Sequence, residues 1–162
     1  MTDLLRRQLL AVLAWSAFAV ALPLHAEPPP YDEAANAQAA MDDALAAAAA
    51  TQRPVLVIFG ANWCEDCRAL DTALKSPKNA DLVMREFVVV KVDVGRFDRN
   101  LPLTAKYGEP TKKGIPAAVI LSPDDRVLYA TRAGELADAR GMSETGIYDF
   151  FRQAADSAKA RR

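Results

Sequence analysis

One short apolar run constrains the fold of this chain more than any other feature. Residues 55–59 read Val-Leu-Val-Ile-Phe, directly after a proline and directly before a Gly-Ala-Asn turn. A continuous run of apolar, mostly β-branched residues of this length predicts a strand that is buried on both faces. Such a strand lies in a sheet that is covered on both sides, as in α/β proteins.

The rest of the chain alternates between strand and helix patterns. Further strands are expected at 87–94, 117–121 and 126–131, and the last two pair as a hairpin around Ser-Pro-Asp-Asp. Helices are expected at 31–51, 64–75, 79–86, 101–107 and 144–158, the last with Ser143 as its N-cap. The pattern predicts a small α/β fold, with a central mixed β-sheet flanked by helices and an extra N-terminal helix. One domain at 52–162 follows a linker and N-terminal helix at 27–51.

The N-terminus has the pattern of a signal peptide at 1–26. Arg6 and Arg7 precede an uncharged apolar run at 9–22, and the segment ends on the small residue Ala26. The run is shorter than the roughly 20 residues that span a bilayer. We therefore expect export to the periplasm with cleavage after Ala26, by either the general or the twin-arginine route. The alternative is an uncleaved leader, which would be the chain's only attachment to a membrane.

Composition excludes several classes of function. The chain has 162 residues, two cysteines and one histidine, and its formal net charge of −1 lacks the basic excess of nucleic-acid-binding proteins. The single histidine, His25, would leave with the leader, which excludes histidine-based catalysis and histidine-ligated metals in the mature chain. Two cysteines alone supply neither a disulfide scaffold nor four zinc ligands. No metal site and no bound cofactor are expected.

The chemistry is expected at Cys64-Glu65-Asp66-Cys67. A spacing of three places both sulfurs on one face of a first helical turn, at a distance that suits a disulfide. Cys64 lies at the helix N-terminus, where unpaired N–H groups and the helix dipole favour a thiolate, so it is the expected nucleophile. Cys67 lies one turn deeper and is expected to resolve the mixed disulfide. The alternatives are a structural disulfide and a copper(I) site of two thiolates.

The sequence resembles the thioredoxin-like superfamily. The resemblance rests on residues 55–67 around the cysteine pair, on Lys91-Val92-Asp93, on Gly114-Ile115-Pro116 and on Ala133-Gly134. It spans about 55–155, and the long stretch between Arg68 and Phe87 is similar to the exported branch that includes the C-terminal domain of the membrane thiol-reductant transporter.

The resemblance implies where a substrate would bind. It implies a cis peptide bond between Ile115 and Pro116, facing the two sulfurs, with the Ile115 backbone as an edge on which an extended substrate pairs. It also places Trp63 beside the site as a substrate-binding residue, although simple core packing is an equal alternative for this side chain.

Four residues are expected to tune the redox chemistry: Glu65, Asp66, Arg68 and Lys91. The two carboxylates raise the pKa of a neighbouring thiol, and Arg68 offsets part of that effect. Lys91 matches a family lysine behind the active site, but Ile58 stands where many relatives have a buried carboxylate. This departure puts the usual proton relay to Cys67 in doubt and leaves Glu65, Asp66 or water to move the proton, with the Lys91 amine at the surface.

The expected function is an exported thiol–disulfide oxidoreductase that exchanges disulfides with protein thiols and disulfides, on the reducing side. A less stable thiolate makes the dithiol a better electron donor. A reductant in an oxidising compartment needs a source of electrons, which implies a membrane electron donor. The alternatives are a disulfide isomerase, a metallochaperone or cytochrome-assembly thiol factor, and a non-catalytic binding module with the same fold.

Overall fold

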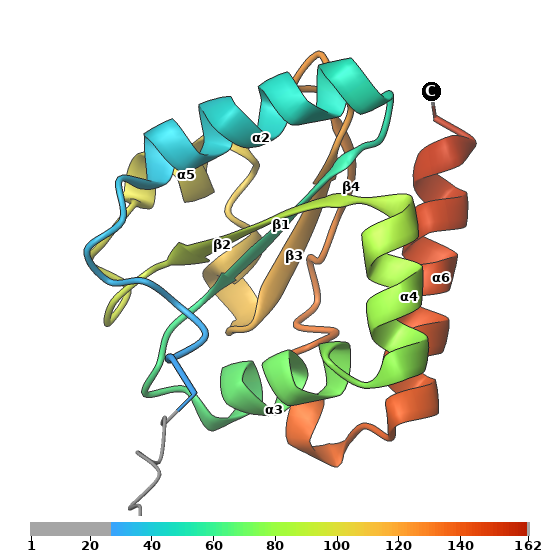
Figure 1. The fold of residues 1–162 in the computed structure, drawn as a ribbon. Coiled ribbons are helices and arrows are strands. Elements are labelled where there is room, and N and C mark those ends of the chain that lie inside the picture. The colour runs from blue at the N-terminus through green and yellow to red at the C-terminus, as the bar shows by residue number, and fades with distance from the viewer. Residues whose placement is uncertain (1–26, 162) are drawn as a thin grey trace, which may run out of the picture.

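The computed structural model describes residues 27–161, so the predicted leader at 1–26 lies outside the described residues. Within that range, no helix is both long and apolar enough to cross a membrane. The described chain forms a sheet with helices on both sides (Figure 1).

Four strands make the sheet, in the spatial order β2-β1-β3-β4. The predicted buried strand is β1, Val55–Gly60, and all six of its residues are buried. It pairs in parallel with β2, Val88–Asp93, and antiparallel with β3, Ala117–Leu121, which in turn pairs antiparallel with β4, Val127–Ala130. The predicted mixed sheet is therefore confirmed.

The side chains of β1 alternate between two hydrophobic cores. Val55, Val57 and Phe59 pack on the side of α2, Ala37–Thr51, and α5, Leu101–Lys106. Leu56 and Ile58 pack on the opposite side. That side is covered by α4, Pro77–Glu86, and α6, Glu144–Lys159, with α3, Glu65–Leu74, below them in Figure 1. Two helical layers explain why a strand of uniformly apolar residues is stable at this position.

Local sequence signals set most helix boundaries. The Ser143 side chain accepts a hydrogen bond from the N–H of Gly146, so the predicted cap of α6 is confirmed. The helix expected at 31–51 begins only at Ala37, because Asn36 caps it by accepting from the N–H of Ala39 and residues 33–35 form a turn. The six preceding residues run instead toward the C-terminal end of β1, which becomes important at the site.

Two short 3₁₀ helices were not expected from the sequence. They are η1, Pro110–Lys113, just before β3, and η2, Ala139–Gly141, just before α6. The helix η1 is followed by Gly114 and the Ile115–Pro116 bond, and η2 packs against α3.

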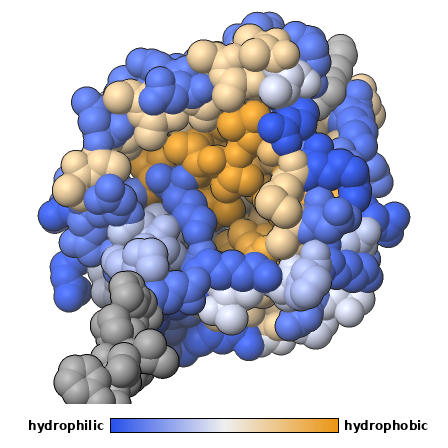
Figure 2. All heavy atoms as spheres, in the orientation of Figure 1, coloured by the Kyte–Doolittle hydropathy of each residue, from blue (hydrophilic) through white to orange (hydrophobic). Residues whose placement is uncertain are grey.

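One face of the molecule carries apolar side chains at its surface. Figure 2 shows hydrophobic residues gathered in the middle of the face seen in Figure 1, framed by hydrophilic residues. The edge strand β2 contributes Val89, which is 40% exposed, and Met84 of the neighbouring α4 is 67% exposed. Burial is thus less complete at the β2 edge than along β1 and β3.

Candidate active site

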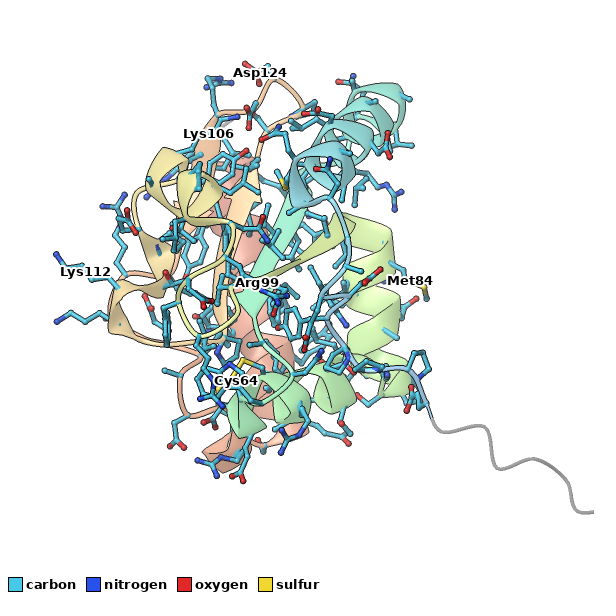
Figure 3. The ribbon with its side chains drawn as sticks, turned by 90° about the vertical axis from the view of Figure 1, so that its left-hand side faces the viewer. Cys64, Met84, Arg99, Lys106, Lys112 and Asp124 are labelled. Carbon is cyan, nitrogen blue, oxygen red and sulfur yellow. A yellow bond between two sulfur atoms is a disulfide. The ribbon has the colours of Figure 1, made fainter. Side chains whose placement is uncertain are left out.

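Cys64 and Cys67 form a disulfide at the start of α3, where β1 has just ended (Figure 3). Their Cα atoms are 5.2 Å apart. Cys64 is the N-cap residue, and its sulfur accepts a hydrogen bond from the N–H of Cys67 at 3.1 Å. Cys64 is 6% exposed, whereas Cys67 is fully buried. The geometry gives the two sulfurs different access to solvent and directs a helix N–H at Cys64.

The loop before β3 lies against Cys64. The Ile115–Pro116 peptide bond is cis, as the family resemblance implied, and the carbonyl oxygen of Ile115 lies 3.5 Å from the Cys64 sulfur. Gly114 leads into this loop with a φ of 119°, a conformation that L side chains rarely adopt. The loop therefore brings backbone rather than bulky side chains to the sulfur.

Trp63 lies on the rim of the site and not in the core. Its side chain is 46% exposed, and its indole N–H donates to the carbonyl oxygen of Gly95 at 2.7 Å. The ring meets Phe97 edge to face, with 6.2 Å between centroids, and the guanidinium of Arg96 lies 5.7 Å from the ring centroid. Core packing therefore does not explain this residue, and its role in binding a substrate stays a prediction.

Glu65 and Asp66 are held by an arginine that sequence reasoning missed. Arg140 of η2 forms an ion pair with Glu65, and its Nε and main-chain N–H both donate to Asp66, at 3.1 and 3.0 Å. The expected partner, Arg68, instead donates to the carbonyl oxygen of Asn62 at 2.7 Å. Arg140 therefore supplies a counter-charge to the acidic pair that was not expected, and the offset by Arg68 stays a prediction.

Lys91 has a carboxylate partner after all. Asp71 of α3 is buried and forms ion pairs with both Lys91 and Lys75, the latter at 3.0 Å. Burial raises the pKa of Asp71, but hydrogen bonds and charge from Lys91 and Lys75 outweigh it, and the pKa lies below its ordinary value. Ile58 carries no carboxylate, but Asp71 of α3 gives Lys91 an acidic partner that the sequence analysis did not expect. A proton relay from this pair to Cys67 stays a prediction.

The segment before α2 reaches the same region. Tyr31 is buried, with 1% of its surface exposed, and it belongs to the same core cluster as both cysteines.

Of the site residues that the sequence analysis missed, Asp71 could have been found from the sequence, because it lies four residues after Cys67 on the same helix face. No local signal marked Tyr31 or Arg140, which are distant from the cysteines along the chain.

The described residues show no cluster of side chains that would support the alternative of a metal site. Among residues 27–161, no three or more His, Cys, Asp or Glu side chains gather in a group able to hold a metal ion. The chemistry available at the site is that of two sulfurs, a backbone edge and the charged groups of α3 and η2.

Comparisons with known proteins agree with this geometry. A family model described as thioredoxin-like matches residues 36–123. A crystal structure described as a disulphide isomerase from Xylella fastidiosa Temecula1 shares 54% sequence identity, covers 79% of this chain and 98% of its own, and has a TM-score of 0.77. The comparison with curated protein sequences gave no match.

More distant structures share the fold. The reduced C-terminal domain of DsbD from Neisseria meningitidis is 20% identical, covers 72% of this chain and 96% of its own, and has a TM-score of 0.51. A thioredoxin from Thermus thermophilus is 24% identical, covers 71% and 81% of the two chains, and has a TM-score of 0.52. At these identities the likeness concerns architecture alone.

Proposed function

The chain belongs to the thioredoxin-like family and is a thiol–disulfide oxidoreductase, and we propose that it works as an exported reductant of protein disulfides. The observation that carries the proposal is that the two sulfur atoms have different surroundings. Cys64 caps a helix beside the Ile115 carbonyl oxygen, whereas Cys67 is buried more deeply in the disulfide form. An attacking thiol and a resolving thiol need these different surroundings.

The proposed reaction begins with the reduced protein. The Cys64 thiolate attacks one sulfur of a substrate disulfide, and the other substrate sulfur leaves as a thiolate. Cys67 then loses its proton and attacks the Cys64 sulfur of the mixed disulfide, which releases the second substrate thiolate and forms the Cys64–Cys67 disulfide. Two electrons have passed to the substrate, and a thiol donor must return them.

Substrate binding is proposed at two features of the rim. The cis loop offers the Ile115 carbonyl beside Cys64, so an extended substrate chain can pair with this backbone. Trp63, the residue before Cys64, and Phe97, which its ring contacts, supply exposed aromatic surface. Both features contact a substrate without selecting one sequence, which suits a protein that acts on several partners.

The reducing direction is proposed from the charges at the helix start. Glu65 and Asp66 disfavour a thiolate on Cys64, and Arg140 compensates only part of two negative charges. A destabilised thiolate makes the dithiol a stronger electron donor. Equilibration with glutathione tests this direction, and a reduction potential above roughly −180 mV, the range of isomerases and oxidants, would exclude it.

The leader pattern at 1–26 is the reason for proposing export to the periplasm. A reductant in that compartment in turn needs a membrane electron donor. No cofactor is required, because the two sulfurs carry both electrons.

Isomerase activity is the second candidate, and one observation favours it: the 54% identical Xylella structure is described as a disulphide isomerase. Refolding of a protein with scrambled disulfides distinguishes an isomerase from a reductant, since only an isomerase restores activity without net reduction.

Trapping tests the exchange itself. Cys67→Ala leaves the attacking sulfur without its resolving partner, so mixed disulfides with substrate proteins should accumulate in the compartment to which the chain is exported. Cys64→Ser is the matched control and should trap nothing, because Cys67 is buried. Insulin reduction should be lost in both variants. Equal trapping by the two variants, or none by Cys67→Ala, contradicts the proposal.

A further inference from the structure

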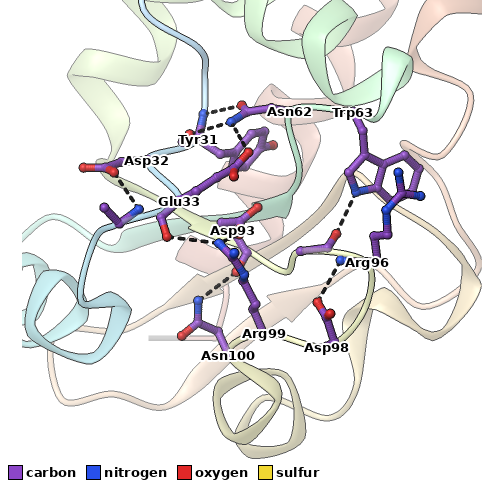
Figure 4. A network of polar contacts seen from close by, with 12 residues as sticks. Tyr31, Asp32, Glu33, Asn62, Trp63, Asp93, Arg96, Asp98, Arg99 and Asn100 are labelled. Atoms are coloured by element: carbon purple, nitrogen blue, oxygen red, sulfur yellow. Dashed lines mark hydrogen bonds and ion pairs between the residues drawn. The ribbon is translucent and has the colours of Figure 1, made fainter.

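The segment at 27–36 is clamped to the active-site turn by side chains (Figure 4). Asn62, two residues before Cys64, accepts from the main-chain N–H of Tyr31 at 3.0 Å and donates to the Tyr31 carbonyl oxygen at 2.8 Å. The same amide donates to Glu33 at 3.0 Å, and Arg99 donates to the Glu33 carbonyl oxygen at 3.1 Å. Together, these hydrogen bonds hold the backbone of Tyr31 in place relative to the cysteines.

The ring of Tyr31 enters the molecule behind the disulfide. A Cβ atom placed on Gly60 would overlap the hydroxyl end of Tyr31 and would lie 3.0 Å from the sulfur of Cys67. The phenol oxygen and the buried sulfur therefore lie near the same point beside Gly60, and the Tyr31 ring can occupy it only because residue 60 has no side chain. Gly60 has no unusual backbone angle, so the close approach of Tyr31 is the reason for a glycine there.

Burial, together with nearby negative charges, keeps the phenol neutral. Burial raises the pKa of Tyr31, and the negative charges of Asp71 on α3 and Asp93 at the end of β2 raise it further. Lys91 and Lys75 pair with Asp71, and Arg99 lies 3.3 Å from Asp93. A neutral phenol cannot accept the proton of Cys67, but it can donate a hydrogen bond to a sulfur that has lost its proton.

We propose that Tyr31 is a positioning residue for the resolving cysteine: its hydroxyl donates a hydrogen bond to the Cys67 thiolate as the mixed disulfide is resolved. The inference rests on the proposed function and adds a group to its second step. The proton of Cys67 passes to water, the thiolate attacks the sulfur of Cys64, and the substrate thiolate leaves. Stabilisation by Tyr31 makes this thiolate available in a buried setting where it would otherwise be unfavourable.

Tyr31→Phe tests the proposal, since it removes the hydroxyl and keeps the ring. The reduced protein is mixed with a limiting amount of an aromatic disulfide such as dithiobis(nitrobenzoate). Release of the second coloured thiol then reports attack by Cys67 on the mixed disulfide at Cys64, independently of any protein substrate. Tyr107→Phe is the matched control, because its hydroxyl is hydrogen-bonded to Asp125.

We expect the rate of the second release, plotted against pH, to give curves for Tyr31→Phe and the wild type that cross. Loss of the hydrogen bond should move the midpoint of the second release upward by about one pH unit, which lowers the thiolate fraction about tenfold at neutral pH. A thiolate of higher pKa is also about threefold more nucleophilic. Tyr31→Phe should therefore be about threefold slower than the wild type at neutral pH and about threefold faster on the alkaline plateau.

Structural damage gives a different result. If the substitution disturbs the site as a whole, the rate of the second release falls by the same factor at every pH. If the hydroxyl has no role, the pH profile of Tyr31→Phe matches those of the wild type and of Tyr107→Phe. Either result overturns the proposal. The two proposals fail separately. If Cys67→Ala traps no proteins while the profiles cross, the substrate assignment is wrong and the role of Tyr31 stands.

Discussion

The main-chain N–H and the guanidinium of Arg140 both bind the carboxylate of Asp66, 74 residues earlier in the chain. The same guanidinium pairs with Glu65. The two residues between the cysteines are therefore fixed to η2 and do not point freely into solvent. We therefore expect the redox properties of the site to depend on the loop just before α6 as well as on the four-residue motif itself.

Replacing Arg140 by alanine should make the dithiol more reducing. Two carboxylates at the start of α3 would lose their counter-charge, and their negative charge would then destabilise the Cys64 thiolate more strongly. We expect the reduction potential to fall by about 10–30 mV, since 30 mV corresponds to ~1.4 kcal/mol for two electrons. Equilibration with glutathione measures it.

Arg85→Ala is the control for this change, because Arg85 pairs with Asp81 on the exposed side of α4. Its potential should equal that of the wild type. Glu65→Gln with Asp66→Asn should shift the potential in the opposite direction. If Arg140→Ala leaves the potential unchanged, the acidic pair does not act on the sulfurs.

Asp71→Asn should lower stability at neutral pH and have little effect in acid. The folded-state pKa of Asp71 lies below its ordinary value of 3.8, so its contribution to stability is complete above that value and disappears as the pH falls through the folded-state pKa. We expect a loss of about 1.5–3 kcal/mol at pH 7, typical of a hydrogen bond between charged groups. Urea unfolding at pH 7 and near pH 2.5 measures the difference. A gap of equal size at both pH values would contradict the assigned ion pairs.

Trp63→Ala should weaken substrate binding more than it affects folding. The side chain is 46% exposed, so little core packing is lost, but the aromatic rim it forms with Phe97 disappears. For a protein disulfide substrate we expect KM to rise several-fold with kcat changed less, since about 1 kcal/mol of contact corresponds to that factor. Reduction of a small disulfide should remain close to wild type. A loss of rate that is equal for both substrates would mean that Trp63 supports the cysteines rather than the substrate.

Gly60→Ala should destabilise the wild-type protein by about 1–3 kcal/mol, the usual cost of forcing a methyl group into a filled space. The methyl group would meet the end of the Tyr31 ring. In a Tyr31→Leu background the same change should cost clearly less, because the shorter side chain leaves room. Thermal unfolding of the four proteins gives the coupling between the two positions. Additive effects would show that the glycine is required for another reason.

Much of the fold could be predicted from the sequence, because its signals are local. The apolar run of β1, the hairpin around residues 122–125 and the Ser143 cap each depend on neighbouring residues, and all three appear in the structure. The cysteine pair was found in the same way, since the spacing of three is itself the signal.

The missed parts of the site depend on contacts between distant segments. Arg140 reaches Asp66 only because η2 packs against α3, and nothing in the sequence near either residue indicates it. The helix predicted from residue 31 had favourable composition, but Asn36 caps it later and leaves Tyr31 free to enter the core. Propensity describes the preference of a segment and says nothing of the space that the rest of the fold leaves for it.

The close fit between Tyr31 and Gly60 also limits how this protein can diverge. A side chain at position 60 becomes acceptable only after the aromatic ring at position 31 has been lost, so the order of substitutions in a lineage is constrained. Relatives that have a side chain at position 60 should lack an aromatic ring at position 31. The two positions should covary across the family even though 28 residues and a helix lie between them.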